Sequence, residues 1–376
     1  MTVAGDPGAA HRRPDARHLE TVLRRFLGPT PGRVEELVAG HINFSWRVRV
    51  ARGPGYLLQR INHQVFRDPV AVMENVARVT EHVRAELAAR GVDDLDRRCL
   101  RLVATRDGAL YHVDEEGWHY RLYRFIPGTV THVRAEDPRR VEAAAFAFGA
   151  FLEQLAGLDP ASLHETISRF HDTGDRYLQL ERAVAEDARG RAAGCRAEID
   201  GYLEHRALAE RPHGDLPLRA VHDDAKLTNV LFDEATDQAL CVIDLDTVMP
   251  GLACFDFGEM IRSMSHRFAE DEAEPAHVRC DLELAAAIAR GFLAGAGPAL
   301  SAAEVASLVD GGLRMTAENG VRFLADHLAG DLYFRVRRPG QNLDRARTQL
   351  ALLRSLRASE DRLRETVDRA WRTVSG

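Results

Sequence analysis

The sequence predicts an α+β protein with a small, strand-rich N-terminal part and a larger, mostly helical C-terminal part. Before about residue 128, several segments alternate apolar and polar residues with the period of two expected of strands. Beyond that point the apolar residues recur with a helical period of about 3.6 residues. The exception is NVLFDEATDQALCVIDLD, residues 229–246, which predicts a short hairpin inserted among the helices. We therefore expect a flexible tail at 1–17, an N-terminal domain at 18–128 and a C-terminal domain at 129–376.

Composition limits the classes of protein to which this chain can belong. It has 376 residues, 45% of them hydrophobic and 28% charged, which is typical of a globular protein. A formal net charge of −7 disfavours a nucleic-acid-binding protein, because binding a phosphate backbone requires a basic surface. The five cysteines form no CxxC pair, and the sequence has no apolar run of membrane-spanning length and no signal-type N-terminus. We expect a cytoplasmic protein with reduced thiols and no membrane partner; its oligomeric state stays open, with a monomer slightly favoured.

The first predicted elements are a hairpin and a helix. Trp46 and Val48 alternate with arginines, and an RGPG turn at 52–55 separates them from a second strand. The Asp-Pro pair at 68–69 is typical of a helix N-cap followed by proline in the first turn, and the apolar face that follows predicts a helix ending at Gly91.

The remaining elements follow from the same two periods. Three more segments have the alternation of strands: 99–105, 109–113 and 118–126. Five segments of the C-terminal domain have the period of helices: 141–158, 176–188, 282–295, 305–330 and 345–374.

A motif with catalytic chemistry precedes the inserted hairpin. Four residues fit the spacing H-x-D-x-K-x-x-N: His222, Asp224, Lys226 and Asn229. Asp244 follows at the end of the hairpin's second strand. A kinase catalytic loop and its metal-binding strand have this layout. Since phosphoryl transfer needs an orienting carboxylate, oxygen ligands for magnesium and a cation near the moving phosphate, the motif predicts a phosphotransferase.

Each residue type suits one role in that reaction. Asp224 would accept the proton of the acceptor hydroxyl as the catalytic base. Asn229 and Asp244 would hold magnesium, with Asp246 as a candidate second carboxylate ligand. Lys226 is the one lysine among 50 lysines and arginines, and it would lie near the γ-phosphate. A compact, mobile ammonium suits that position better than a planar guanidinium.

Two features near the motif have structural alternatives. We group His222 with the catalytic residues, although a lone histidine is more often a packed or capping residue. Residues 256–258 spell the DFG metal motif of protein kinases, but they come too late in the chain to follow the hairpin strand directly. We therefore assign the metal to Asp244 and expect Asp256 to bond the backbone of the catalytic loop.

At these residues the chain resembles the aminoglycoside phosphotransferase-like kinases. More narrowly, it is similar to the N-acetylhexosamine 1-kinases in six segments: GHINFSWRV, YLLQRINHQVFRDPVAVMENV, FHDT, HDDAKLTNVLFDE, CVIDLDTVMPGLACFDFGE and ENGVRFLADHLAGDLYFRV. The resemblance implies a two-lobed protein-kinase-like fold, with a small antiparallel-sheet N-lobe carrying one main helix and a larger helical C-lobe carrying the catalytic hairpin. It also implies ATP and Mg²⁺ as cofactors and phosphorylation of the anomeric C1 hydroxyl of N-acetylglucosamine or N-acetylgalactosamine.

The resemblance further implies a nucleotide site in the N-lobe. Residues 40–45 would form the phosphate-covering loop, although by themselves they predict a routine turn. The lysine that the kinase fold carries on its third strand, paired with a helix glutamate, is missing, which leaves Gln59 or Arg60 for its place. We prefer a pair of Arg60 with Glu74, with Glu81 as the alternative partner. Including the hinge between the lobes, the cofactor-binding candidates are Gly40, Asn43, Ser45, Arg60, Glu74, Tyr123 and Phe125.

For the sugar, the resemblance points to residues of the C-lobe and of the phosphate loop. The acceptor-binding candidates are Asp224, Arg322, Tyr333, His41, Asp326 and His171. Arg322 and Asp326 lie one helical turn apart, so they would otherwise form an exposed ion pair worth a few tenths of a kcal/mol. Tyr333 would otherwise be a core aromatic residue, and the FHDT segment at 170–173 would otherwise cap a helix.

Two other functions stay open. The same fold could act on another hydroxyl, such as that of an aminoglycoside, homoserine or choline, but a cationic acceptor needs an acidic pocket and the candidates include Arg322. A catalytically silent nucleotide-binding protein would be expected to lack the base or a metal ligand, whereas Asp224, Asn229 and Asp244 are all present.

Overall fold

The computed structural model describes residues 13–29, 32–37, 42–210 and 215–375. The N-lobe elements are α1 (Ala16–Leu27), β1 (Arg33–Leu37), β2 (Phe44–Arg49), β3 (Tyr56–Arg60), α2 (Pro69–Ala89), α3 (Leu95–Arg98), β4 (His112–Val113) and β5 (His119–Arg124). The C-lobe elements are β6 (Thr129–Val130), α4 (Pro138–Gln154), α5 (Thr173–Glu186), α6 (Arg196–Leu203), α7 (Ala207–Glu210), β7 (Arg219–Val221), β8 (Val230–Asp233), β9 (Ala239–Val242), β10 (Met249–Gly251), α8 (Ala253–Met264), α9 (Leu282–Ala296), α10 (Ala302–Ala329), α11 (Gln341–Ala358) and α12 (Glu360–Ser375).

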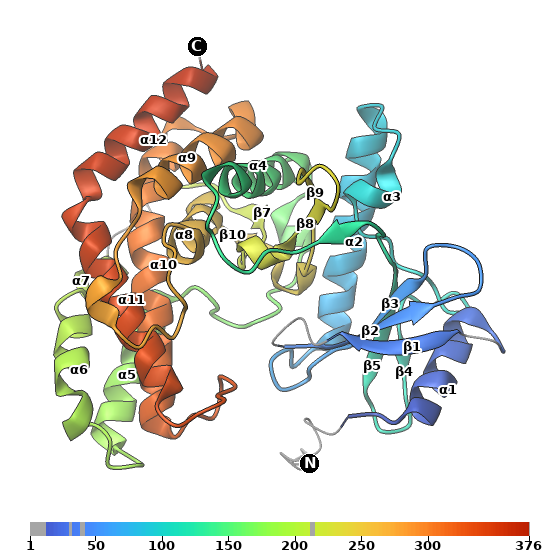
Figure 1. Cartoon of the computed structure of the whole chain (residues 1–376), viewed down its shortest axis with the longest axis horizontal. Coiled ribbons are helices and arrows are strands. Elements are labelled where there is room, and N and C mark those ends of the chain that lie inside the picture. The colour runs from blue at the N-terminus through green and yellow to red at the C-terminus, as the bar shows by residue number, and fades with distance from the viewer. Residues whose placement is uncertain (1–12, 30–31, 38–41, 211–214, 376) are drawn as a thin grey trace.

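The chain forms two lobes, with the blue N-lobe sheet on one side and the orange and red helices of the C-lobe on the other (Figure 1). The N-lobe strands make one antiparallel sheet in the order β1-β2-β3-β5-β4. The C-lobe contains two small sheets, β6-β8-β9 and β10-β7. Because β6 pairs with β8, the chain joins the C-lobe sheet at Thr129, next to the boundary predicted at residue 128.

The two faces of the N-lobe sheet are covered by different parts of the protein. Side chains of a strand alternate between faces, and Trp46 and Leu58 lie on the face that packs against α1. The register pairs Ser45 with Gln59 and Gln59 with Arg121, so these three side chains share the opposite face. That second face is the one that meets the C-lobe.

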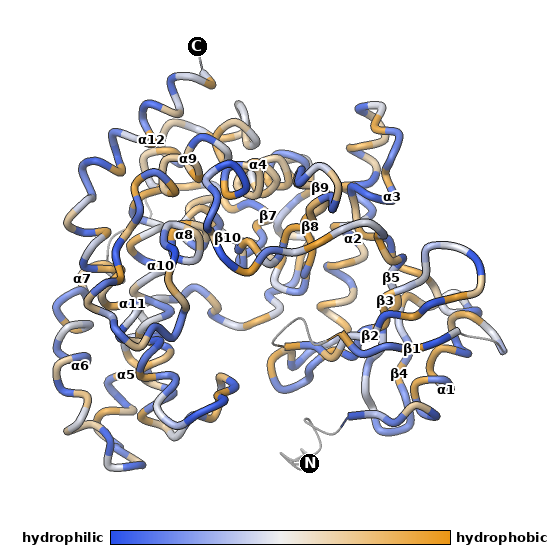
Figure 2. Tube along the Cα trace, viewed as in Figure 1, coloured by the Kyte–Doolittle hydropathy of each residue, from blue (hydrophilic) through white to orange (hydrophobic). Residues whose placement is uncertain are grey.

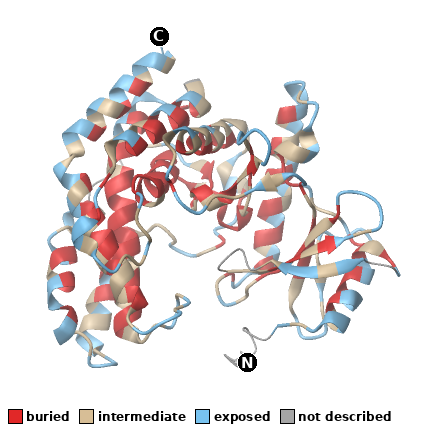
Figure 3. Ribbon diagram, in the orientation of Figure 1, coloured by how far each residue is buried: buried red, intermediate tan, exposed pale blue. Residues whose placement is uncertain are grey.

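The centre of the C-lobe is the contact between α8 and α10, where buried residues are concentrated (Figure 3). Every residue of α8 except Ser263 is buried. A Cβ added at Gly258 would lie 2.4 Å from the carbonyl oxygen of Gly311, so the close approach of the two helices requires glycine there. The DFG letters at 256–258 therefore belong to a core helix.

Most predicted elements are confirmed. Asp68 caps α2 through the backbone N–H of Ala71 at 3.0 Å, and Pro69 is the first helical residue. The segment 229–246 contains the β8–β9 hairpin. Orange apolar positions gather on the sides of the helices that face the lobe interior, as the helical periodicity predicts (Figure 2). The α+β arrangement is confirmed.

Three details differ from the prediction. Helix α1 begins at Ala16, capped by Asp15, and thus starts inside the predicted tail. Residues 99–105 are not a regular strand, because their pairing with β5 is limited to a bridge between Leu102 and Tyr123. The segment 345–374 is two helices, since α11 ends one residue before Ser359; the apolar period continues across the break and could not mark it.

Candidate active site

Asp256 holds the backbone of the catalytic loop, residues 222–229. Its carboxylate, on the first turn of α8, accepts hydrogen bonds from the backbone N–H of His222 at 2.9 Å and of Asp223 at 2.7 Å. Asp256 is buried, and the Thr247 hydroxyl adds a bond to the carbonyl oxygen of His222 at 2.8 Å. The structural role predicted for Asp256 is confirmed by these bonds.

The ring of His222 supports the loop from inside the C-lobe. It is fully buried and lies edge-on to Phe148, with 5.2 Å between the ring centroids. Its Nε2 donates to the carbonyl oxygen of Ile243 at 2.9 Å, which leaves Nδ1 to accept from the backbone N–H of Asp224 at 3.3 Å. Because both ring nitrogens are used within the protein, the prediction of a catalytic role for His222 is corrected to a positioning role.

Three side chains of the catalytic loop meet at Asp224. Lys226 Nζ lies 2.6 Å from Asp224 Oδ2, and Asn229 Nδ2 donates to the same oxygen at 3.0 Å. Asn229 Nδ2 also donates to the backbone oxygen of Asp224 at 2.9 Å. Asp224 Oδ1 has no hydrogen-bond partner in the described part of the chain, so one carboxylate oxygen is available to a bound hydroxyl.

The surrounding charges set the protonation of these groups. Burial would raise the pKa of Asp224, but the Lys226 ammonium holds that pKa below its usual value, so the carboxylate is ionised. Burial would lower the pKa of Lys226, but Asp224 and Asp244 raise it, so the ammonium stays charged. Burial, together with the charges of Asp246 and Asp224, raises the pKa of Asp244 to about 6. The negative charge around Asp244 is therefore incompletely balanced.

Asn229 and Asp244 are suited to hold a divalent metal. Asp244 follows β9 in left-handed backbone with φ of 63°, and its carboxylate has no hydrogen-bond partner among the residues that the structure describes. Asp246, in contrast, uses Oδ1 for Arg121 and accepts from Asn43 Nδ2 at 2.7 Å through Oδ2. No group of three or more His, Cys, Asp or Glu side chains in the described ranges could hold a metal. One carboxylate and one amide oxygen fit Mg²⁺, which in nucleotide sites takes its other ligands from phosphates and water.

Strand β3 directs Gln59, and not Arg60, toward Arg121 on the face of the sheet that meets the C-lobe. Arg60 lies on the α1 face of the sheet, with its guanidinium carbon 4.3 Å from the ring centroid of Trp118 and 4.6 Å from that of Phe44. The prediction that Arg60 takes the lysine position is wrong by one residue, because one step along a strand reverses the face. Gln59 Oε1 accepts from Arg121 Nε at 3.0 Å and from Nη2 at 2.8 Å.

Arg121 on β5 is a site residue that the sequence prediction missed. It is 1% exposed, and its Nη1 donates to Asp246 Oδ1 at 2.5 Å. Burial would lower the pKa of Arg121, but the Asp246 carboxylate raises it, so the guanidinium is charged. The only sequence signal was the alternation around HYRLYR, which does not distinguish a buried arginine from a surface one.

The glutamates of α2 do not pair with strand β3. Glu74 Oε2 lies 2.6 Å from His164 Nε2 and 3.7 Å from Arg78 Nη2, and all three side chains are exposed. Glu81 is exposed and has no ion pair within the described ranges. Neither the preferred Arg60–Glu74 pair nor the alternative with Glu81 is formed.

Tyr123 and Phe125 lie where β5 leads into the connection between the lobes. The backbone N–H of Arg124 donates to Arg101 O at 2.9 Å, and that of Phe125 donates to Gly55 O at 3.2 Å. These two amides are therefore used within the N-lobe. Contact of Tyr123 and Phe125 with adenine stays a prediction.

The predicted phosphate-covering loop is described only at its end. Gly40 and His41 lie outside the described residues. Asn43 contacts the loop that follows β9, as given above, and Ser45 Oγ accepts from Gln59 Nε2 at 3.1 Å. The end of the predicted loop is therefore joined both to β3 and to the C-lobe.

Arg322 and Tyr333, both predicted to bind the acceptor, lie together in the C-lobe. The guanidinium carbon of Arg322 is 5.3 Å from the ring centroid of Phe170, 5.7 Å from that of Tyr333 and 5.3 Å from that of Phe334. Tyr333 is 53% exposed, so it is not a core residue. This cluster presents one cation and an accessible phenol at the surface.

Asp326 holds the loop that presents Tyr333. Its Oδ1 accepts from the backbone N–H of Leu332 at 2.9 Å and of Tyr333 at 2.8 Å. Its Oδ2 accepts from Phe334 N at 3.0 Å and from Asn342 Nδ2 at 2.9 Å. With both oxygens occupied and the residue buried, the two earlier interpretations of Asp326, as a substrate ligand or an exposed ion-pair partner, are corrected.

His171 joins α10 to the catalytic loop. Its Nδ1 lies 2.9 Å from Glu318 Oε1, and its Nε2 donates to Asp223 O at 3.1 Å. Burial would lower the pKa of His171, but the Glu318 carboxylate raises it to about 9. The side chain is 5% exposed, so the predicted substrate contact is corrected to a positioning role. Its neighbour Asp172 caps α5, as the structural alternative for this segment predicts.

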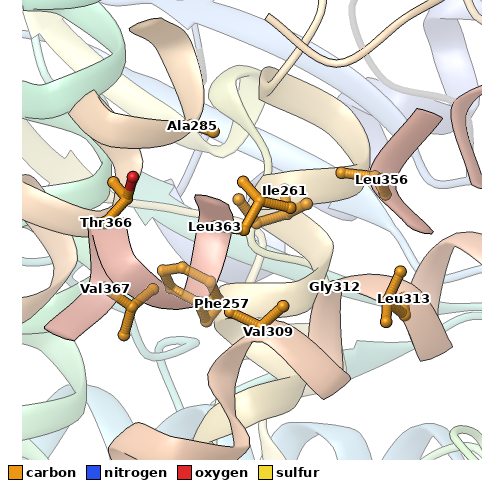
Figure 4. A pocket seen from close by; sticks show the side chains of 11 residues that line it. Phe257, Ile261, Ala285, Val309, Gly312, Leu313, Leu356, Leu363, Thr366 and Val367 are labelled. Atoms are coloured by element: carbon orange, nitrogen blue, oxygen red, sulfur yellow. The ribbon is translucent and has the colours of Figure 1, made fainter. Parts of the chain in front are cut away.

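Two cavities of the described structure do not coincide with these residues. One apolar space of about 10 Å³ lies among α8, α9, α10, α11 and α12, and its lining includes Phe257 and Ile261 of α8 and Leu363 and Val367 of α12 (Figure 4). It has room for no more than one water molecule, so it is a packing gap. A larger cavity of about 290 Å³ lies between α2, α4 and β9, and no predicted site residue lines it.

A comparison with known protein families agrees with the fold and the site described above. The model of the phosphotransferase enzyme family APH matches residues 33–300, a range that contains the N-lobe sheet, the catalytic loop and the metal strand. The chain belongs to this family. In this APH family chain, the predicted base Asp224, Lys226 and the predicted metal ligands therefore lie within the part that matches the family.

Solved structures similar to this APH family chain confirm the two-lobed, protein-kinase-like fold. A microcompartment-associated aminopropanol kinase is 18% identical, with a TM-score of 0.56 over 95% of this chain and 100% of its own. An aminoglycoside phosphotransferase from Alicyclobacillus acidocaldarius is 16% identical, with a TM-score of 0.59 over 89% and 92%. An amicoumacin kinase in complex with AMP-PNP, Ca²⁺ and Ami is 14% identical, with a TM-score of 0.57 over 92% of this chain and 94% of its own. Within the described ranges, none of the helices combines the length and apolarity that a membrane crossing requires.

Proposed function

We propose that this protein transfers the γ-phosphoryl group of ATP to the anomeric C1 hydroxyl of an N-acetylhexosamine, with Mg²⁺ as the metal. The observation that carries the proposal is the cluster at Asp224, where Lys226 and Asn229 bind one carboxylate oxygen and leave the other available. Membership of the APH family supports the reaction type. The resemblance in the acceptor segments supports the sugar.

Asp224 would orient the C1 hydroxyl in line with the γ-phosphate and accept its proton through Oδ1. Because the anomeric hydroxyl is more acidic than an ordinary alcohol, a carboxylate whose pKa is lowered by Lys226 is still an adequate base. Lys226, bound to the other oxygen, would hold a positive charge beside the phosphoryl group as it moves. Asn229 and Asp244 would hold the Mg²⁺, which when bound neutralises charge on the phosphates. Most of the rate would come from positioning and charge neutralisation.

Arg322 and Tyr333 would bind the acceptor. A phenol beside a polyol offers both ring stacking and a hydrogen bond, and Tyr333 is exposed enough to do so. The cationic Arg322 beside it disfavours positively charged acceptors. Kinases of amine-bearing acceptors nevertheless share the fold, as the aminopropanol kinase does, so an amino alcohol or aminoglycoside is the second candidate class.

ADP release in the presence of different acceptors tests the proposal. The panel contains N-acetylglucosamine, N-acetylgalactosamine, kanamycin, choline and 1-O-methyl-N-acetylglucosamine, which lacks a free C1 hydroxyl. We expect turnover with one or both free sugars and none with the methyl glycoside. Turnover of kanamycin or choline without turnover of the sugars would establish the second class, and equal turnover of the methyl glycoside would exclude transfer to C1.

A further inference from the structure

Arg121 carries a buried positive charge where three elements of the candidate nucleotide site meet. Its guanidinium contacts Gln59 on β3 and Asp246 in the loop after β9, and Asp246 in turn contacts Asn43 at the end of the predicted phosphate loop. The Arg121 side chain is 1% exposed. Removing a guanidinium from water is costly unless the charge is paired and well bonded. The buried position of Arg121 therefore has a cost that a solvent-exposed arginine would not have.

Gln59 allows this charge to lie beside β3. In the kinase fold, the lysine near the α- and β-phosphates is on that strand. Here the neutral Gln59 is on the face of β3 toward the C-lobe, directly across from Arg121 in the sheet register. Its amide oxygen accepts two N–H groups of the guanidinium. The positive charge that the kinase fold carries on β3 is therefore present in this protein on the neighbouring strand, β5.

Asp246 balances Arg121 and is poorly placed to bind a metal. Both of its carboxylate oxygens are occupied, by Arg121 and Asn43, and its side chain is 2% exposed. Unlike Asp246, Asp244 has a carboxylate with no hydrogen-bond partner in the described ranges. Three of the five N–H groups of Arg121 are used in the bonds above, which leaves one on each terminal nitrogen.

We infer that Arg121 supplies the fixed positive charge that stabilises the nucleotide phosphates, in place of a lysine on β3, and that Asp246 is its counter-ion. The inference rests on the proposed nucleotide-dependent function and is independent of which acceptor is used. A fixed cation in a site of low dielectric constant acts over several ångströms, so direct contact is not required. Arg121 should therefore control nucleotide affinity and leave acceptor binding largely unchanged.

Relocating the charge tests the inference. Arg121→Gln removes the cation, and Gln59→Lys in the same chain returns one to β3. Binding of Mg²⁺–AMP-PNP is measured by calorimetry on the full chain without acceptor, and acceptor KM is measured separately. We expect Arg121→Gln to weaken nucleotide binding by at least about tenfold, the double variant to recover most of that loss, and acceptor KM to change by less than about twofold. Arg121→Lys, which keeps the charge, should bind nucleotide better than Arg121→Gln. Wild-type affinity in folded Arg121→Gln, or no recovery in a folded double variant, overturns the inference.

Two further variants separate the counter-ion from the metal ligand. The Mg²⁺ dependence of AMP-PNP binding is measured for Asp244→Asn and Asp246→Asn, so no turnover is needed. We expect the Mg²⁺ midpoint to rise by at least about tenfold in Asp244→Asn and by less than about twofold in Asp246→Asn. An equal rise in both variants overturns the assignment of Asp246.

Arg219→Gln is the matched control for the loss of an arginine ion pair. Arg219 pairs with Glu304 in the C-lobe, and its side chain is 19% exposed. This variant should lower the Tm without changing nucleotide affinity; a loss of affinity as large as that of Arg121→Gln would contradict the inference. If the wild-type chain binds no Mg²⁺–nucleotide, the proposed function fails together with the inference. If the wild-type chain and Arg121→Gln bind it equally, only the inference fails.

Discussion

Lys226 Nζ lies 2.6 Å from Oδ2 of Asp224, two residues earlier in the catalytic loop. The ammonium therefore neutralises the carboxylate that is proposed to accept the proton, and lowers its pKa. Lys226→Arg keeps the charge but replaces a compact ammonium by a larger planar fork. We expect kcat to fall by at least about tenfold with a smaller change in acceptor KM. Steady-state kinetics measures both, and an unchanged kcat would make the single lysine a compositional accident.

Asp224→Asn should nearly abolish turnover. The amide cannot accept the proton of the acceptor, and the loss of a general base typically lowers kcat by about 10²–10⁴-fold. Because Asn229 and Asp244 are unchanged, binding of Mg²⁺–nucleotide should remain close to that of the wild type. Calorimetry with AMP-PNP and an ADP-release assay measure the two quantities. A variant that turns over at the wild-type rate would remove Asp224 from its role.

Asp256→Ala should destabilise the protein and distort the catalytic loop. It leaves the buried backbone N–H groups of His222 and Asp223 without their acceptor. With about 1–3 kcal/mol for each of the two unsatisfied groups, the free energy of unfolding should fall by about 2–6 kcal/mol. Urea unfolding measures the loss. Asp256→Asn keeps one acceptor oxygen and should lose less; an equal loss in both variants would contradict this explanation.

The raised pKa of His171 leads us to expect that the stability of the protein depends on pH. Its pKa is raised from 6.5 to about 9 in the folded protein, so the protonated ring stabilises the fold fully below pH 6.5. That contribution falls as the pH rises and is lost above pH 9, a decrease of at most about 3 kcal/mol. In His171→Gln this decrease should be absent, and in Glu318→Gln it should be reduced. Urea unfolding across this pH range tests it; a wild-type slope in His171→Gln would contradict it.

Asp326→Ala should impair acceptor binding without touching the acceptor. It removes the carboxylate that accepts the backbone N–H groups of Leu332, Tyr333 and Phe334, so the loop that presents Tyr333 loses its anchor. Acceptor KM should rise by at least about tenfold while nucleotide affinity stays within about twofold. Tyr333→Phe, which keeps the loop anchored, should have a smaller effect. Equal nucleotide and acceptor defects in Asp326→Ala would indicate general destabilisation instead.

The residues that a sequence motif can predict are those that act close together in the chain. Asp224, Lys226 and Asn229 lie within six positions, and their mutual contacts follow from the loop itself. The cap at Asp68 and the β8–β9 hairpin are local for the same reason. The side chains whose roles were predicted wrongly, such as Arg60 and His171, contact partners that are distant in the sequence. Asp326 differs again: its partners are nearby, but the loop geometry that brings them to its carboxylate is not visible in the spacing.

From the sequence alone one could determine the α+β class, while the catalytic loop, the metal strand and, by resemblance, the acceptor residues Arg322 and Tyr333 were predictions. Only the tertiary structure decided that Arg60 faces α1 and that Arg121 faces Asp246. The physical reason is that the period of a strand is two, so a one-residue change in register exchanges its faces. An ion pair spanning 125 positions, such as Arg121–Asp246, leaves no local pattern in the chain. It arises only when the two lobes come together.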